Sequence, residues 1–199
     1  MKIVLASNNK NKLKEFTELF APYDVELIFQ RDAGCNFEVD ETGTTFAENA
    51  YLKAKAVADF AGLPAIADDS GLSVDALNGE PGIYSARYGL GHEATDRERL
   101  AYLLGRMHDK ENRRAHFTCS ICFVTPKGEK LTAEGIMEGE ILKAPAGTNG
   151  FGYDPIFRPD DADCSSAELS AEGKNAISHR GKATRAFMEL FKEYYNDNN

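Results

Sequence analysis

Apolar residues recur along this chain at two spacings, and each spacing predicts a different kind of element. Short apolar runs are typical of buried strands, and the Pro-Lys-Gly turn between the last two runs predicts a hairpin. These strands are expected at residues 2–6, 25–29, 63–67, 116–125 and 129–138. Apolar residues at helical spacing predict helices at about 10–20, 45–61, 96–107 and 178–195.

Polar residues at the expected helix ends support these assignments. Asn8 or Asn9 can cap the first helix, and Thr45 stands three residues before Glu48, which is the spacing of a capping box. Gly62 provides a stop for the second helix, because glycine readily adopts the left-handed conformation that ends helices. Ser178 can cap the final helix.

The stretch Ile66–Leu72 carries the most suggestive chemistry. Its strand is expected to stop at Asp68 and Asp69, with Ser70 and Gly71 forming a tight turn. Two neighbouring carboxylates suit a hard divalent cation such as Mg²⁺, or one can activate water while the other holds the metal. The alternative interpretation is a solvated Asp-Asp turn.

A strand, a polar turn and a helix start follow one another at residues 2–12. Lys10 and Lys12 fall in the first helical turn, beside backbone N–H groups that have no partner within the helix. Such a helix start favours phosphate, and lysines add positive charge. The alternative is a capped helix with solvated lysines. No GxxxxGK[ST] loop is present.

Two further segments carry candidate ligand groups. The acidic loop of Glu38, Asp40 and Glu41 can supply metal ligands if the fold brings it near Asp69, and is otherwise a solvated loop. Residues 147–155 hold three glycines, so that backbone can approach a ligand closely. There, Phe151 or Tyr153 can stack on a planar ring and Asp154 can accept hydrogen bonds, as in base recognition; a plain glycine-rich turn is the alternative.

Composition narrows the class of protein. The chain has 199 residues, 42% of them hydrophobic and 28% charged, with a net charge of -9. A chain this acidic lacks the basic face of a general nucleic-acid binder, and we expect no nucleic-acid partner. It contains no run of about 18 apolar residues and no secretory leader, so we expect no membrane partner. Four scattered cysteines predict reduced thiols in a cytoplasmic protein.

Six motifs in order along nearly the whole chain resemble the inosine triphosphate pyrophosphatase family. They are SNNKNK at 7–12, ETGTTFAENAYLKA at 41–54, IADDSGL at 66–72, PGIYSARY at 81–88, GFGYDPIF at 150–157 and KNAISHRGKA at 174–183. The resemblance implies an α/β fold, with residues 1–199 forming a single elongated domain of two lobes. A long mixed β-sheet with flanking helices and a central nucleotide cleft is implied, as is a homodimer. The implied reaction is Mg²⁺-dependent hydrolysis of ITP, dITP, XTP and dXTP to the monophosphate and pyrophosphate.

The resemblance also implies catalytic, metal-binding and nucleotide-binding roles for individual residues. Asp69 would be the proton acceptor and a metal ligand, and a second metal-binding carboxylate would be Asp40 or Glu41. The remaining residues would bind the nucleotide, with Lys53 added by us as a phosphate contact. They are Ser7, Asn8, Asn9, Lys10, Asn11, Lys12, Lys53, Ser70, Phe151, Gly152, Tyr153, Asp154, Lys174, His179 and Arg180.

The expected mechanism follows from these charges. Water attacks the α-phosphorus, Asp69 orients or deprotonates it, and metal and lysines offset the charge of the leaving pyrophosphate. His179 or Arg180 is the expected donor to the 6-oxo group of hypoxanthine or xanthine. Two alternatives stay open: a pyrophosphatase for modified pyrimidine triphosphates, and a nucleotide-binding module without turnover.

Overall fold

The structure is a computed structural model that describes residues 1–89, 91 and 93–198, with backbone only for Lys10, Asn11 and Glu15. The strands are β1 (Lys2–Leu5), β2 (Glu26–Phe29), β3 (Ala65–Val74), β4 (Arg114–Val124), β5 (Lys130–Ile141) and β6 (Phe157–Pro159). The α-helices are α1 (Lys10–Phe20), α2 (Phe46–Ala61), α3 (Asp96–Arg106), α4 (Ala171–Ile177) and α5 (His179–Asn198). Short 3₁₀ helices occupy η1 (Arg31–Ala33), η2 (Asp75–Leu77), η3 (Gly82–Arg87) and η4 (Asp154–Ile156).

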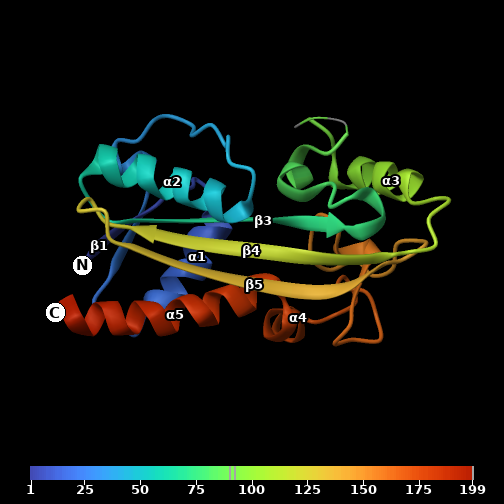
Figure 1. Ribbon diagram of the computed structural model, residues 1–199. Helices are drawn as coiled ribbons and strands as arrows, with labels where there is room; N and C mark the ends of the chain where they lie inside the picture. The colour runs from blue at the N-terminus through green and yellow to red at the C-terminus, as the bar shows by residue number, and fades with distance from the viewer. Residues whose placement is uncertain (90, 92, 199) are drawn as a thin grey trace. The chain divides into compact units, whose positions relative to one another are not determined.

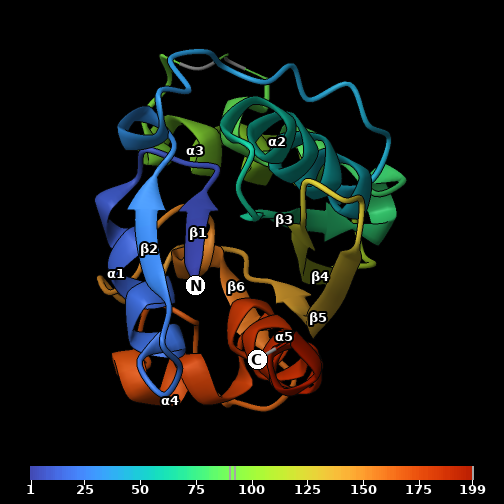
Figure 2. The same cartoon turned by 90° about the vertical axis from the view of Figure 1, so that its left-hand side faces the viewer.

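The strands form a six-stranded mixed sheet in the order β2-β1-β3-β4-β5-β6. Strand β1 pairs in parallel with β2, as the two arrows of Figure 2 show, and also in parallel with β3. Strand β6 pairs with the end of β5 in the antiparallel direction. The expected α/β fold with a mixed sheet and flanking helices is confirmed.

Strand β3 corrects the expected position of the two aspartates. It continues through Asp68, Asp69, Ser70 and Gly71 to Val74, so the predicted tight turn is wrong. The physical reason lies after Gly71, where Leu72 and Val74 are fully buried and continue the inward alternation of a strand. Burial of these apolar side chains outweighs the local turn preference of the Asp-Asp-Ser-Gly sequence.

The chain divides into two compact units that share strands β3, β4 and β5. Unit 1 comprises residues 1–69, 120–134 and 184–199, and unit 2 comprises residues 70–119 and 135–183. The boundary in β3 falls directly after Asp69. Each unit has a hydrophobic core of its own.

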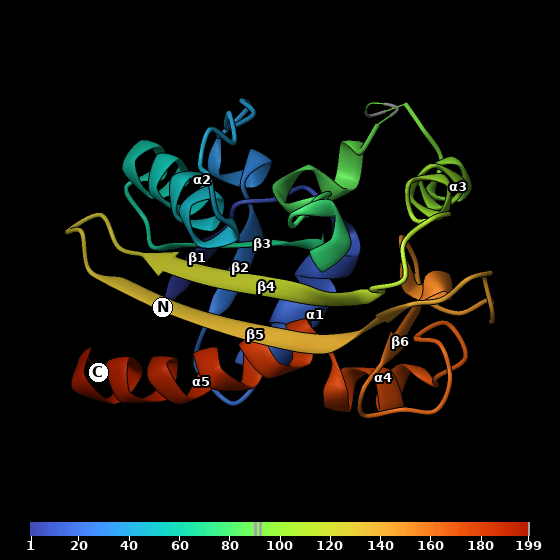
Figure 3. The ribbon, with the colours of Figure 1, turned by 45° about the vertical axis from the view of Figure 1, so that its right-hand side comes forward.

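In unit 1, helices cover both faces of the sheet, as Figure 3 shows for α2 and α5. Small residues of α2, including Ala50, Ala54 and Val57, pack against β1, β3 and the side of β4 that carries Cys122. On the other face, Phe123 of β4 contacts Phe191 of α5, with ring centroids 5.8 Å apart. Adjacent residues of β4 thus point to opposite faces, and both faces are buried.

In unit 2, the apolar side of α3 joins a core made by strand and loop residues. Leu100, Leu103 and Met107 pack in one cluster with Leu72 and Val74 of β3. Helix α4, which the sequence patterns did not predict, follows a cap in which Ser170 accepts from the Gly173 N–H. This helix is short and has no buried residue, so it carries no apolar stripe to detect.

Most of the predicted helix ends are confirmed. Thr45 caps α2 through the Glu48 N–H, and Gly62 ends it with a φ of 63°. Ser178 caps α5 by accepting from the Gly181 N–H at 3.0 Å. The hairpin turn is present, with the Thr125 N–H donating to the Glu129 carbonyl.

The state of the cysteines and the character of the helices bear on the expected environment of the chain. All four cysteines are free thiols. Within residues 1–89, 91 and 93–198, no helix is both long and apolar enough to span a membrane. This includes α5, which leads to the C-terminus in Figure 1.

Candidate active site

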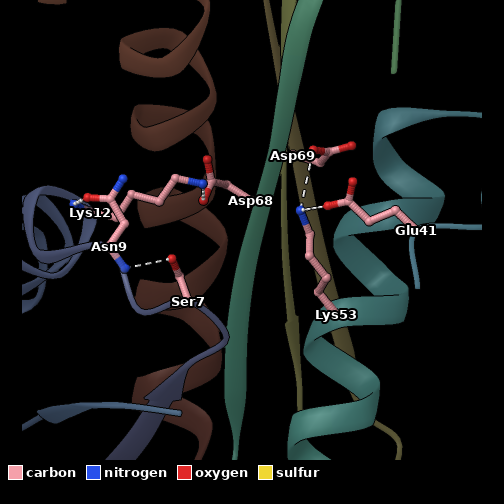
Figure 4. Close-up of polar contacts among 7 residues, drawn as sticks. All are labelled: Ser7, Asn9, Lys12, Glu41, Lys53, Asp68 and Asp69. Carbon is pink, nitrogen blue, oxygen red and sulfur yellow. Dashed lines mark hydrogen bonds and ion pairs between the residues drawn. The ribbon is translucent and has the colours of Figure 1, made fainter. Parts of the chain in front are cut away.

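The junction of β1 and α1 in unit 1 has the expected strand, turn and helix arrangement. Asn9 caps α1, because its side-chain oxygen accepts from the Lys12 N–H at 3.3 Å. Ser7 supports the turn by accepting from the Asn9 N–H at 3.1 Å (Figure 4). Asn8 is exposed in the same turn, while the side chains of Lys10 and Asn11 lie outside the described residues. The first turn of α1 is therefore positioned to offer backbone donors to an anion.

Asp68 and Asp69 point to opposite sides of β3, as Figure 4 shows. Side chains alternate in a strand, so the two neighbours cannot act as a pair of ligands on one face. Asp68 is 4% exposed, and its Oδ1 lies 2.6 Å from Nζ of Lys12. The expected joint metal site of the two aspartates is corrected: Asp68 instead holds the lysine of the first turn of α1.

Asp69 faces α2 and the acidic loop. Nζ of Lys53 lies 3.3 Å from Oδ1 of Asp69 and 2.7 Å from Oε1 of Glu41, so one ammonium group bridges two carboxylates. The other oxygen of Asp69, Oδ2, is buried and has no hydrogen-bond partner within the part of the chain that the structure describes. Asp40, the alternative to Glu41, is exposed. Of the two acidic-loop candidates, Glu41 is therefore the one that shares the Lys53 ammonium group with Asp69.

Asn49 holds the acidic loop against α2, a role that no sequence signal indicates. Its side chain is fully buried, and its Oδ1 accepts from the Gly43 N–H at 2.9 Å. A Cβ atom at residue 43 would lie only 2.7 Å from that oxygen, so glycine is required for this close approach. Residues 41–43 are thereby fixed where Glu41 reaches Lys53.

Burial and nearby charges shift the pKa values of both Asp69 and Lys53. Burial raises the pKa of Asp69, and the nearby Lys53 only partly offsets this effect. For Lys53, burial alone would lower the pKa, but Asp69 and Glu41 outweigh it and raise the pKa. A buried carboxylate with a raised pKa is a better proton acceptor than an ordinary aspartate, which suits it to activate water.

Unit 2 holds the aromatic glycine loop. Phe151 is 64% exposed, whereas Tyr153 is 5% exposed and its hydroxyl donates to the Ser85 carbonyl oxygen at 2.9 Å. Burial raises the pKa of Tyr153 to about 12. Of the two rings, only that of Phe151 is presented to solvent for stacking, and Tyr153 anchors the loop.

Asp154 stabilises the same loop through hydrogen bonds of its side chain. It is 3% exposed, and its Oδ2 accepts from the Phe151 N–H at 2.8 Å and from Nζ of Lys174. A Cβ atom at Gly150 would lie 2.1 Å from the same oxygen, so a side chain there would displace the carboxylate. The structure therefore uses Asp154 to hold Phe151 and Lys174 together.

Two cations contact the exposed Phe151 ring, one from α4 and one from the start of α5. Nζ of Lys174 lies 4.9 Å and the Arg180 guanidinium carbon 5.8 Å from the ring centroid. The ring of His179 stacks on Phe117 at 4.8 Å, which fixes its plane. Gly152 belongs to the loop, and Ser70 is half-buried in β3 directly after Asp69.

Two contacts in unit 2 could not be predicted from the sequence patterns. Ser85 is buried and accepts from the Leu72 N–H at 2.9 Å, which ties η3 to β3. Asp96, at the start of α3, accepts from the Gly152 N–H at 2.8 Å. Asp96 shows only a helix-start signal in the sequence. Ser85 belongs to the motif at 81–88, but its contact with Leu72 could not be predicted, because the two residues are distant along the chain.

Comparison with known proteins finds relatives along nearly the whole chain and solved structures with the same fold. A dITP/XTP pyrophosphatase of Streptomyces coelicolor is 47% identical over 199 residues, covering 96% of this chain and 98% of the relative. A dITP/XTP pyrophosphatase of Thermus thermophilus is 50% identical over 195 residues, covering 97% and 93%. The structure of the Staphylococcus aureus Ham1 protein matches with a TM-score of 0.92 and 43% identity, covering 98% of this chain and all of that one.

The family assignment rests on these near-full-length matches and on a family model. The Ham1 family model matches residues 3–190, which include all six motifs found in the sequence. The expected family resemblance is confirmed: this chain belongs to the Ham1 family.

Proposed function

We propose that this protein is a nucleoside triphosphate pyrophosphohydrolase that converts ITP, dITP, XTP and dXTP to the monophosphate and pyrophosphate. The relatives from S. coelicolor and T. thermophilus carry the name dITP/XTP pyrophosphatase and match along nearly the whole chain. Such an enzyme would clear these non-standard purine nucleotides from the nucleotide pool. The reaction is hydrolysis of the bond between the α- and β-phosphates.

The observation that carries this proposal is the environment of Asp69. Its carboxylate is largely buried, is bridged by Lys53 to Glu41, and keeps one oxygen without a hydrogen-bond partner in residues 1–89, 91 and 93–198. A buried acceptor without a partner costs about 1–3 kcal/mol, so this oxygen is placed to take a bound water or a cation as its partner. An acceptor kept available beside a lysine is what water activation next to a polyanion requires.

The residues around Asp69 fit a magnesium ion. Asp69 and Glu41 supply hard carboxylate oxygens, and the Oδ2 of Asp69 is available. No group of three or more His, Cys, Asp or Glu side chains gathers as a metal site in the described part of the chain. Mg²⁺ commonly takes one or two protein carboxylates and completes its shell with phosphates and water, so Asp69 and Glu41 would be enough to hold it. When bound, it would neutralise phosphate charge and polarise the reacting phosphorus.

We propose that unit 1 binds the triphosphate. The first turn of α1 offers backbone donors, Lys12 lies at its start, and Ser7, Asn8 and Asn9 line the turn. Lys53 approaches from α2. Asp69 accepts a proton from the water that attacks the α-phosphorus, and Lys12 and Lys53 offset the negative charge of the departing pyrophosphate. We assign Lys10 and Asn11 to the same phosphates from their positions in the motif.

We propose that unit 2 reads the base. The Phe151 ring stacks on the purine, and Lys174 and Arg180 bring positive charge to its edge. His179 or Arg180 donates to the 6-oxo group, where adenine carries an amino donor instead. A donor left facing that amino group would be unpaired, and such mismatches discriminate by factors of roughly 10⁴.

Further proposals concern the assembly and location of the enzyme. We propose that residues 1–199 form one domain of two lobes that binds a single nucleotide, and that the protein is a homodimer. The free thiols support a cytoplasmic location, because disulfides are rare in that reducing compartment.

Products formed from a panel of nucleotides test the reaction. The protein is incubated with Mg²⁺ and separately with dITP, XTP, dGTP, dATP and dUTP, and pyrophosphate and orthophosphate are measured. We expect pyrophosphate from dITP and XTP, with the standard purines at least about 100-fold slower. Orthophosphate as the product would mean attack at the terminal phosphorus and would contradict the mechanism. Preference for dUTP would favour the pyrimidine alternative, and binding without turnover would favour a binding module.

Two aromatic variants separate stacking from loop anchoring. Phe151→Ala is expected to raise the KM for dITP about tenfold, because base stacking on an aromatic ring is worth roughly 1–3 kcal/mol. Tyr153→Phe loses a buried hydrogen bond and is expected to lower the free energy of unfolding by about 1 kcal/mol. Its KM should stay within about twofold of the wild-type value. Steady-state kinetics and urea unfolding check both, and the reverse pattern would assign stacking to Tyr153.

A further inference from the structure

Asp96 contacts the proposed base-reading loop from outside the six motifs. Its Oδ2 accepts from the Gly152 N–H at 2.8 Å, and its Oδ1 lies 2.6 Å from Nη2 of Arg99. Arg99 is itself fixed, because its Nη1 donates to the Ala94 carbonyl oxygen. Both carboxylate oxygens of Asp96 are thus engaged, one with the loop and one with its own helix.

The start of α3 is rigid, so Asp96 has a defined position. Thr95 and Glu98 form a full capping box: the Thr95 hydroxyl accepts from the Glu98 N–H, and the Glu98 carboxylate accepts from the Thr95 N–H at 2.8 Å. Leu100 and Leu103 anchor the following turns in the core of unit 2. A carboxylate on such a support can hold a flexible glycine loop in place.

The loop needs this support at Gly152. Gly150 and Gly152 adopt left-handed conformations with φ of 74° and 59°, so the backbone on both sides of Phe151 is unusually free when it is not held. Two successive N–H groups donate to two carboxylates: that of Phe151 to Asp154 and that of Gly152 to Asp96. The exposed Phe151 ring has little core packing to fix it, so its direction depends on these two bonds together with the contacts of Lys174 and Arg180 on the ring.

We propose that Asp96 is a positioning residue for purine recognition: it accepts from the Gly152 N–H and so holds the Phe151 ring ready to stack on the base. This inference rests on the proposed function and extends it to a residue outside the nucleotide-binding set. Holding the ring in advance reduces the entropy lost on binding. Asp96 touches neither the phosphates nor the attacking water in this assignment, so it affects substrate binding and leaves the chemical step unchanged.

Three variants test the role of the acceptor oxygen. Asp96→Ala removes it, whereas Asp96→Asn keeps an oxygen for Gly152 but loses the negative charge near Arg99 and the helix start. Glu98→Ala breaks the capping box in the same turn and leaves the Gly152 bond in place. It controls for a general weakening of α3, because it removes a carboxylate with no contact to the loop.

We expect Asp96→Ala to raise the KM for dITP about tenfold with kcat within about twofold, as loss of a hydrogen bond to a charged group implies. Asp96→Asn should restore KM to within about twofold of wild type, and Glu98→Ala should raise KM far less than Asp96→Ala does, because it loosens the start of α3 but keeps the Gly152 bond. Binding of dIMP, measured calorimetrically, should weaken about tenfold in Asp96→Ala, while binding of pyrophosphate should be unchanged. An unchanged KM in Asp96→Ala, or equal effects of Ala and Asn, would overturn the proposal.

Amide hydrogen exchange keeps this inference separate from the proposed function. By NMR, exchange of the Gly152 amide should be at least about tenfold faster in Asp96→Ala than in wild type and Asp96→Asn. Unchanged exchange would overturn the tether even if dITP is the substrate. If the wild-type protein releases no pyrophosphate from dITP, the proposed function fails, and the exchange rates still decide whether Asp96 holds the loop.

Discussion

Replacing Asp69 with asparagine is expected to lower kcat for dITP hydrolysis by about 10³-fold or more, since a positioned general base contributes roughly 10²–10⁴. Asparagine has nearly the same shape but cannot take a proton from water. It also removes one of the two carboxylates proposed for Mg²⁺. Pyrophosphate release under saturating dITP measures the effect, and dITP binding should persist because the base-reading loop is untouched.

The loss in Asp69→Asn should not come from unfolding. Burial raises the pKa of Asp69 in the folded protein, so its ionised form is disfavoured there relative to the unfolded chain. At pH values above that raised pKa, ionisation of Asp69 therefore costs folding free energy, and a neutral asparagine does not incur this cost. The free energy of unfolding at pH 7 should equal or exceed the wild-type value in urea titrations.

Asp68→Asn is the matched control, because the two aspartates are adjacent yet face opposite sides of β3. Asp68 holds Lys12, so its replacement should act mainly on KM through the phosphate-binding turn. A kcat for Asp68→Asn as low as that for Asp69→Asn would contradict the separate roles assigned here.

Local signals made much of the fold predictable. The caps at Thr45, Gly62 and Ser178 lie within a few residues of the groups they bond, so the sequence contains the whole interaction. The anion site at the start of α1 is predictable for the same reason, since Asn9 caps the turn that carries Lys12. Elements with a clear apolar period and a local cap were placed to within a few residues.

The motif that contains Asp68 and Asp69 does not show on which side of β3 each side chain lies. Their strand continues because Leu72 and Val74 are buried in unit 2, and that burial depends on contacts with α3. The partnership of Glu41 with Lys53 likewise depends on the Asn49–Gly43 bond, which folds the acidic loop against α2. Tertiary contacts of this kind decide which side of a strand faces a ligand, and a single sequence does not display them.

Lys53 is expected to stabilise the protein by standing between two carboxylates, and Lys53→Met removes that charge while keeping an unbranched apolar stem. Side chains of Lys53, Glu41 and Asp69 are 17%, 25% and 15% exposed, so the ion pairs are only partly screened by solvent. Loss of one partner of a largely buried pair leaves uncompensated charge, and we expect the free energy of unfolding in metal-free buffer to fall by about 2–4 kcal/mol. Urea titration measures it.

Magnesium should rescue Lys53→Met more than it stabilises the wild type. A cation that binds only the folded state stabilises it by about 2.7 kcal/mol at 100 times its Kd. In wild type, the ammonium group already lies against Glu41 and Asp69, so an entering cation must compete with it. Lys55→Met on the same helix is the control: it breaks the exposed pair with Asp59, and its stability should not respond to Mg²⁺ differently from wild type. Equal gains with Mg²⁺ in all three proteins would show that Glu41 and Asp69 do not form the cation site.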